Sequence, residues 1–82
     1  MPQRLRRLAA RDVLAALKRL GFEVVATRGS HAKLRRAAED GETQTLTLPL
    51  HKDLDPGTIR AIYRQAKRFI PENEIRTWFY GD

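Results

Sequence analysis

The chain has 82 residues, no cysteine and a net charge of +6, with 41% hydrophobic and 32% charged residues. These values describe one small globular domain without disulfides or thiolate metal sites, and they exclude a disordered tail. No apolar run approaches the roughly 20 residues that span a bilayer. Arg11 and Asp12 interrupt the apolar stretch that a signal peptide would need near the start. We therefore expect a protein of the reducing cytoplasm that does not enter a membrane.

The positive charge is concentrated in the first part of the chain. The first 36 residues hold ten of the 16 Lys and Arg residues but only two of the ten acids. A basic half of this kind is typical of proteins that bind a polyanion, and nucleic acid is the usual polyanion. The charge distribution therefore favours a nucleic-acid partner.

The first predicted element is an amphipathic helix from about residue 9 to residue 20. Its apolar residues fall on one side of a helix with 3.6 residues per turn. They are Ala9, Val13, Ala16, Leu17 and Leu20. Gly21 follows at the position where a helix commonly ends in a left-handed residue, so we place the helix end there.

Three strands are predicted next, because β-branched side chains and alternating leucines follow Gly21. They span residues 22–27, 31–37 and 43–51. Residues 28–30 make a tight link, and Asp40-Gly41 is a strong hairpin signal between the second and third strands. Pro49 cannot donate a hydrogen bond to a neighbouring strand, so the third strand ends there or lies on an edge of the sheet.

A second long helix is predicted from Asp55 to Ile70. Asp55 fits the N-cap and Pro56 the first helical position, and Pro71 ends the helix. Its apolar stripe consists of Ile59, Ile62, Tyr63, Ala66, Phe69 and Ile70. A cationic stripe on another side consists of Arg60, Arg64, Lys67 and Arg68. We interpret the cationic stripe as a solvated face, with contact to a nucleic-acid groove as the alternative.

Residues 71–82 predict a short third helix that brings Ile75, Trp78 and Phe79 together. Trp78 is interpreted as a core residue, and an exposed aromatic for a protein partner is the alternative. The α-β-β-β-α order predicts the α+β class, with an antiparallel three-stranded sheet, helices packed on one face and a short C-terminal helix. We expect a single domain over residues 1–82, with a core over about 9–70 and a helical tail over 71–82.

The stretch Gly29-Ser30-His31 opens the second strand, in which side chains alternate between the two faces of the sheet. Ala32 and Leu34 are then expected to face the helices, so that His31 faces water. The basic and hydroxyl residues expected on that wet face are Lys33, Arg35, Thr45 and Thr47. Together they form a plausible cradle for a phosphodiester, and a solvated strand face is the alternative.

Two stretches of the chain resemble the HicA-type toxins, which are small bacterial ribonucleases paired with HicB-type antitoxins. The stretches are LKRLGFEVVATRGSHAKL and LTLPLHKDLDPGTIRAIYRQA. The resemblance rests on a helix that ends before Gly-Phe, then Gly-Ser-His, Pro-x-His and a Pro-Gly-Thr helix start, and it covers about residues 10–67. It implies a double-stranded-RNA-binding-like fold, cleavage of messenger RNA and inhibition by a HicB-like antitoxin protein. It also implies a catalytic histidine, which corresponds to His31. The segment before the first helix and the tail after Pro71 depart from the family pattern.

Other residues near His31 complete the predicted site. Gly29 is either a turn residue with positive φ or a point where the backbone approaches phosphate, and Ser30 is a possible secondary site residue. His51 is either a second acid or base or, as we favour, a brace for the turn after the third strand. The residues predicted to contact RNA are Arg28, Lys33, Arg35, Arg36, Thr45 and Thr47.

The expected chemistry needs no metal and no cofactor. Ribose carries its own nucleophile, the 2′-hydroxyl, so cleavage needs only a base, an acid and stabilisation of charge. An imidazole titrates close to neutral pH and can supply the base or the acid. The expected products are a 2′,3′-cyclic phosphate and a 5′-hydroxyl. Two alternatives are a non-catalytic RNA-binding module of the same fold and a DNA-binding regulator, although strands between the helices disfavour a helix-turn-helix.

Overall fold

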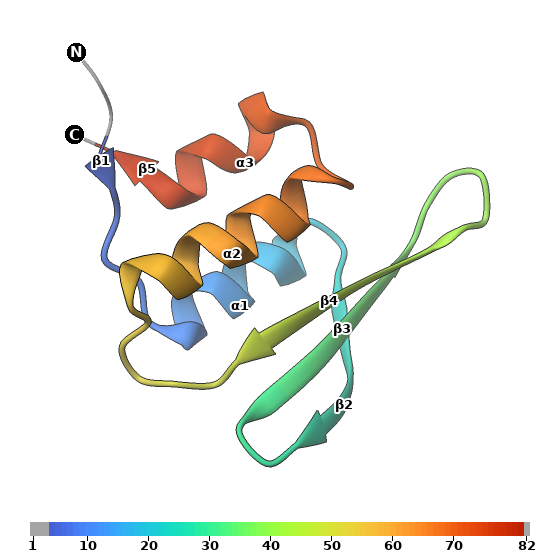
Figure 1. Ribbon diagram of the computed structural model, residues 1–82. Helices are drawn as coiled ribbons and strands as arrows, with labels where there is room; N and C mark the ends of the chain where they lie inside the picture. The colour runs from blue at the N-terminus through green and yellow to red at the C-terminus, as the bar shows by residue number, and fades with distance from the viewer. Residues whose placement is uncertain (1–3, 82) are drawn as a thin grey trace.

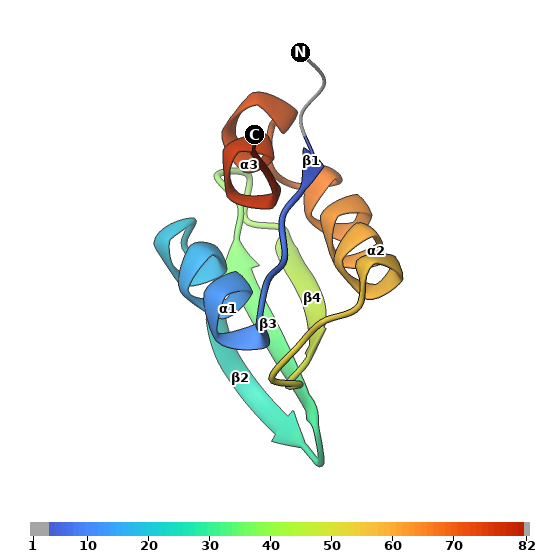
Figure 2. The same ribbon diagram turned by 90° about the vertical axis from the view of Figure 1, so that its left-hand side faces the viewer.

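The computed structural model describes residues 4–81 of the chain. Its elements are, in chain order, β1 (Arg4–Leu5), α1 (Ala10–Arg19), β2 (Glu23–Arg28), β3 (His31–Ala37), β4 (Thr43–Pro49), α2 (Pro56–Lys67), α3 (Glu72–Phe79) and β5 (Tyr80–Gly81). Helices α1 and α2 lie over one face of the sheet formed by β2, β3 and β4 (Figure 1, Figure 2). Helix α3 lies beside α2 at the end away from the β2–β3 turn. The predicted α+β fold of the double-stranded-RNA-binding type is confirmed.

Helix α1 ends as predicted, in the turn that leads into the sheet. The N–H of Phe22 donates to the Leu17 carbonyl at 3.0 Å, and the N–H of Gly21 donates to the Lys18 carbonyl at 3.0 Å. This pair of bonds is a Schellman motif, which requires a left-handed residue, and Gly21 has a φ of 97°. Strand β2 begins at Glu23, one residue later than predicted, because the Phe22 N–H is used in this motif, and the strand extends to Arg28.

Strand β3 is the central strand, with β2 and β4 antiparallel on its two sides. The residues of β3 and β4 that face the helices are buried, and their neighbours along each strand are exposed. The buried residues are Ala32, Leu34, Leu46 and Leu48. The period of two that the sequence predicts therefore separates a packed face from a bare face.

The two outer strands differ in how they are covered. All six residues of β2 are exposed, and its register shifts between Val24 and Ala26. Pro49 is the last residue of β4, the other edge strand, so the strand both ends there and lies on an edge.

The predicted Asp40-Gly41 hairpin is confirmed, with the N–H of Gly41 donating to the Ala38 carbonyl at 2.9 Å.

The C-terminal tail belongs to the hydrophobic core. Ile75 and Phe79 of α3 are 0% and 1% exposed, so the helical tail contributes to the hydrophobic core. Trp78 is half-buried and packs against the same core, as its interpretation as a core residue requires. The Tyr63 hydroxyl of α2 donates to the Glu72 carboxylate at 2.8 Å, and burial together with this bond raises the pKa of Tyr63.

A second, two-stranded sheet joins the two ends of the described chain and was not predicted. Leu5 of β1 lies opposite Tyr80 of β5, and the N–H of Arg6 donates to the Phe79 carbonyl at 2.8 Å (Figure 1). Leu5 and Leu8 pack against the core. The arginine-rich segment over residues 4–9 is therefore held along the folded domain.

Arg36 is a structural residue at the end of β3. Its guanidinium donates to the Leu20 carbonyl at 2.8 Å, to the Phe69 carbonyl at 3.1 Å and to the Gln44 side chain at 2.8 Å. It also lies 4.9 Å from the centroid of the Phe22 ring. One charged side chain thus satisfies carbonyls at the ends of two helices and ties both helices to the sheet.

Removing this guanidinium should destabilise the fold. We expect Arg36→Met to lower the free energy of unfolding by about 1–3 kcal/mol, because partly buried carbonyls lose a charged donor. Urea unfolding followed by circular dichroism measures the change. Arg35→Met removes a neighbouring exposed guanidinium and should change the free energy by less than about 0.5 kcal/mol. Equal losses in the two variants would contradict the structural role of Arg36.

The cap of α2 makes stability depend on pH. The N–H of Thr58 donates to the Asp55 carboxylate at 2.6 Å. This bond, and to a lesser extent a bond from the Thr58 hydroxyl, holds the pKa of Asp55 below its ordinary value. A carboxyl whose pKa is lower in the folded state than in the unfolded state stabilises the fold when the pH is above its unfolded-state pKa. This stabilisation is lost as the pH falls through the folded-state pKa. Asp55→Ala should therefore lower the melting temperature at pH 7, and the gap from the parent should narrow below about pH 4. A gap that stays constant from pH 7 to pH 2 would show that the charge of Asp55 contributes nothing.

Candidate nucleic-acid interface

The face of the sheet that the helices leave uncovered, here the exposed face, carries most of the predicted site residues. Residues directly opposite one another on neighbouring strands share a face, with strands about 4.8 Å apart. The pairing gives three rows across β2, β3 and β4: Arg28, His31 and Pro49; Ala26, Lys33 and Thr47; Glu23, Arg35 and Thr45. The pairing places His31, Lys33, Arg35, Thr45 and Thr47 on one surface, as the alternation predicted.

The charge of this face is highest near His31. Arg28 lies directly opposite His31, and Lys33 is two residues along β3 on the same side. At the other end of the face, Glu23 lies opposite Arg35 and offsets part of its charge. A phosphate placed beside His31 would therefore meet the cations of Arg28 and Lys33 first.

Arg36 does not belong to this surface. It follows Arg35 in β3, so its side chain points to the helix side, where its guanidinium donates to Leu20, Phe69 and Gln44. This placement does not favour the prediction that Arg36 contacts RNA, because three of its N–H groups already donate within the fold. Arg36 is therefore dropped from the candidate RNA contacts.

The turn before His31 is built for a tight hairpin. Gly29 has a φ of 57° and Ser30 does not have a positive φ, which is the pattern of a type II′ turn. A Cβ built on Gly29 would meet no heavy atom within 4 Å, so the turn is open to solvent. The Ser30 carbonyl accepts the N–H of Leu50 at 2.6 Å, which fixes the turn against the end of β4. The positive φ accounts for the glycine, and the open space leaves room for a ligand beside it.

A hollow of about 450 Å³ opens beside His31, at the edge of β4. His31, Thr47 and Pro49 line it from the sheet, and the start of α2 lines it from the other side. The residues from that side are Asp55, Gly57, Thr58, Ala61, Ile62 and Gln65. The Gln65 side chain accepts the N–H of Thr47 at 3.5 Å, which brings α2 up to the strand edge.

Thr58 and Gln65 were not predicted as site residues. Their spacing, with Ala61 and Ile62 between them, places them along one stripe of α2, and this periodicity is visible in the sequence. What the periodicity cannot indicate is which strand edge the stripe borders. The hollow therefore adds a hydroxyl and an amide to the imidazole that the sequence singled out.

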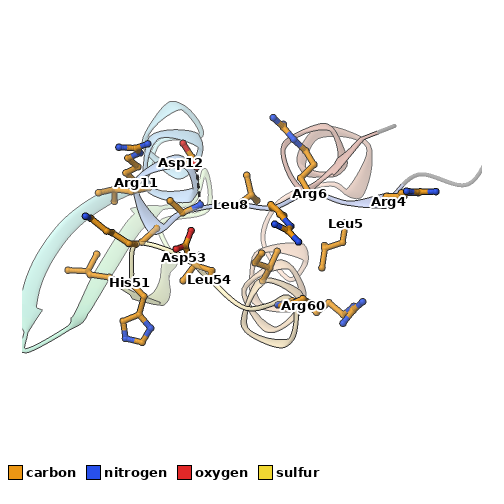
Figure 3. Close-up of a pocket in the computed structure, with 18 residues that line it drawn as sticks. Arg4, Leu5, Arg6, Leu8, Arg11, Asp12, His51, Asp53, Leu54 and Arg60 are labelled. Carbon is orange, nitrogen blue, oxygen red and sulfur yellow. Dashed lines mark hydrogen bonds between the residues drawn. The ribbon is translucent and has the colours of Figure 1, made fainter.

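His51 lies apart from His31 and lines a different cavity. Its backbone carbonyl accepts the N–H of Ala10 at 3.1 Å, so the residue links the loop after β4 to the start of α1. Its imidazole is exposed and points away from Leu8 and Leu54 in that cavity (Figure 3). This backbone contact does not involve the imidazole, so the role of the His51 side chain stays a prediction.

Residues 4–81 hold no group of three or more His, Asp or Glu side chains placed to ligate a metal ion together. Across the same part of the chain, none of the helices has the length and apolar character needed to cross a membrane.

A comparison with protein families agrees with the resemblance in the sequence. The family described as "HicA toxin of bacterial toxin-antitoxin" matches residues 10–67, which includes α1, the whole three-stranded sheet and α2. No curated protein matches the chain. The family match spans well over half of the 82 residues, and its range contains both the exposed face and the hollow beside His31. The chain therefore belongs to the HicA toxin family of bacterial toxin–antitoxin systems.

Proposed function

We propose that this toxin is an endoribonuclease that cleaves messenger RNA, with His31 as the general base or acid and no metal ion. The observation that carries the proposal is the position of His31, which is exposed at the rim of a hollow, opposite Arg28 and near Lys33. The family supports a toxin role, and RNA is the polyanion that supplies its own nucleophile to such a site.

The proposed reaction is an attack of the 2′-hydroxyl on the adjacent phosphorus. The imidazole of His31 takes the proton of the 2′-hydroxyl as the O2′–P bond forms. The P–O5′ bond then breaks, and the departing 5′ oxygen takes a proton from water. Arg28 and Lys33 are placed to stabilise the extra negative charge on the phosphorane oxygens.

The hollow gives the substrate a place beside the base. Thr47, Thr58 and Gln65 line it with hydroxyl and amide groups, which can donate to phosphate or ribose oxygens. RNA that crosses the exposed face would then meet Lys33 and Arg35 on β3 and Thr45 on β4. Strand backbone and side chains together would hold a single strand in an extended path.

The antitoxin partner that the family implies is proposed to be HicB-like and to cover the exposed face. Acidic groups of the antitoxin would meet Lys33 and Arg35, which would speed association and block the path to His31. Co-expression should yield a complex in which cleavage is suppressed.

A non-catalytic RNA-binding module is the second candidate. One observation favours it: within residues 4–81, His31 is the one histidine on the exposed face, and His51 does not reach the same hollow. An RNA-binding surface needs no acid–base pair, whereas a ribonuclease must find its second proton donor elsewhere. The DNA-binding alternative is disfavoured, because three strands, and not a short turn, separate α1 from α2.

Replacing His31 should abolish cleavage without unfolding the domain. His31 is exposed, so its replacement should leave the core intact. General acid–base catalysis contributes about a hundred- to ten-thousand-fold, so His31→Ala should lower the cleavage rate by that factor with an unchanged circular dichroism spectrum. His51→Ala is the matched control and should cleave RNA at close to the parent rate. A 2′-deoxy substitution at the cut position should block the parent enzyme, and a chelator should not.

Three results would contradict the proposal. An active His31→Ala with an inactive His51→Ala would place the site at the loop after β4. Loss of activity with a chelator would require a metal ion. RNA binding by the parent protein without any cleavage would favour the non-catalytic module.

Phosphate contacts on the exposed face should make RNA binding depend on salt. In an inactive His31→Ala background, we expect Lys33→Met to reduce the slope of log Kd against log salt by about 0.7–1 unit, because one released counterion is lost per phosphate contact. Fluorescence anisotropy with labelled single-stranded RNA measures this slope. Arg36→Met removes a cation of the helix side and should leave the slope unchanged in the folded protein. A slope that Lys33→Met does not alter would remove the exposed face from RNA binding.

A further inference from the structure

A second cavity lies outside the proposed site. It has a volume of about 1320 Å³ and lies between the segment over residues 4–9, the start of α1, the loop after β4 and the start of α2 (Figure 3). This N-terminal cleft is separate from the hollow beside His31, and the two share no lining residue. Pockets for small molecules have volumes of roughly 300–1,000 Å³, so the cleft is large enough for a segment of a macromolecule.

The floor of the N-terminal cleft is aliphatic. Leu50 at the edge is 38% exposed, Leu5, Leu8 and Leu14 are half-buried, and Leu54 and Ile59 at the bottom belong to the buried core. The apolar residues that line the cleft are Leu5, Leu8, Leu14, Leu50, Leu54 and Ile59. Apolar surface in an open cleft gains free energy when a partner covers it.

The rim of the cleft is strongly basic. Its cations are Arg4, Arg6, Arg7, Arg11, Lys52 and Arg60, and its acids are Asp12 and Asp53. The Asp12 carboxylate already accepts the N–H of Ala9 at 2.9 Å, which caps α1. Ion pairs within residues 4–81 join Glu72 to Lys67 and to Arg76, and neither of these two cations lines the cleft. Among residues 4–81 no ion pair joins a cation of the cleft to an acid, and Arg6 donates to the Thr77 and Trp78 carbonyls.

The lining decides between two kinds of polyanion. Single-stranded RNA binds proteins through aromatic side chains on which its bases stack, as well as through cations. The lining of the cleft includes no Phe, Tyr or Trp, and its floor consists of leucine and isoleucine. An aliphatic floor inside a ring of cations instead matches a peptide that has aliphatic and acidic side chains on one face.

We propose that the N-terminal cleft binds an acidic, amphipathic segment of a partner protein, independently of RNA cleavage at His31. Aliphatic side chains of the segment cover Leu5, Leu8 and Leu50, and its carboxylates meet the cations of the rim. Pro56 lines the cleft while Asp55 and Gly57 line the hollow, so the two openings flank the first turn of α2. The antitoxin that the family implies can therefore reach the exposed face and the cleft at once, and we assign the segment to it.

The experiment is an NMR titration of the full ¹⁵N-labelled chain with two synthetic peptides of about 16 residues. In the first, leucines and glutamates follow the spacing of an amphipathic helix, and in the second each leucine is replaced by serine at the same net charge. The first peptide should shift the backbone amides of residues 5–14 and 50–60 in a saturable way. The second should bind at least about tenfold more weakly, because it lacks the groups that cover the floor.

Two double variants with the same change in charge test the rim. The double variant Arg7→Glu with Arg60→Glu reverses two exposed cations of the cleft and should weaken binding of the first peptide by about tenfold or more. The double variant Lys18→Glu with Arg64→Glu reverses two exposed cations outside the cleft and should weaken binding of the first peptide by less than about threefold. Circular dichroism confirms that each variant is folded, and a cleavage assay of both reports on the His31 site separately.

Four binding results would each overturn the proposal. No saturable shift in the cleft, or equal binding of the serine peptide, would mean that the cleft does not recognise an amphipathic segment. Equal losses of peptide affinity in the two double variants would mean that the peptide responds to the net charge of the protein and not to the cations of the cleft. The fourth result is that a single-stranded RNA displaces the peptide and loses affinity only for the variant with the two changes in the cleft. This result would mean that the cleft binds RNA and not a peptide segment. Absence of cleavage by the parent protein would bear on the proposed ribonuclease and not on the cleft.

Discussion

The alternation of side chains along β3 is the constraint on which the rest of the structure depends. Because β3 lies between two antiparallel strands and carries helices on one side, Ala32 and Leu34 must be buried and His31 and Lys33 must be exposed. A shift of one residue in register would bury the imidazole and a lysine and expose the core. The Ser30 carbonyl that accepts from Leu50 and the turn at Gly29 hold this register at the end where His31 lies. The hydrophobic core and the candidate site are thus two faces of the same strand.

The same alternation gives two neighbouring arginines different roles. Arg35 is exposed beside Thr45 and opposite Glu23, whereas Arg36 turns to the helices and satisfies the carbonyls of Leu20 and Phe69. A basic run in a sequence therefore cannot be counted as a block of nucleic-acid contacts. Positive charge gathers on two separate surfaces, the exposed face near His31 and the rim of the N-terminal cleft. These two surfaces flank the first turn of α2 and are suited to different ligands, because the cleft has an aliphatic floor and the exposed face is a polar sheet.

Much of this arrangement can be predicted from the sequence, since local signals determine it. Gly21, the Asp40-Gly41 turn, Pro49 and the Asp55-Pro56 helix start mark element boundaries, and the leucine alternation marks the faces. Contacts between distant segments cannot be predicted in this way. The pairing of β1 with β5 leaves no pattern in two-residue strands, and the spacing of Thr58 and Gln65 does not indicate that they border β4. The same limit applies to Arg36, whose acceptors come from the ends of α1 and α2.

The central claim is that the imidazole of His31 activates the 2′-hydroxyl of RNA on the exposed face. The chemical ends of the cleaved RNA test this claim most directly, because they identify the nucleophile. Mass spectrometry of the products from a short RNA of defined sequence should find a 2′,3′-cyclic phosphate on one fragment and a 5′-hydroxyl on the other. A 3′-hydroxyl with a 5′-phosphate would mean that water attacks the phosphorus, and it would contradict the mechanism.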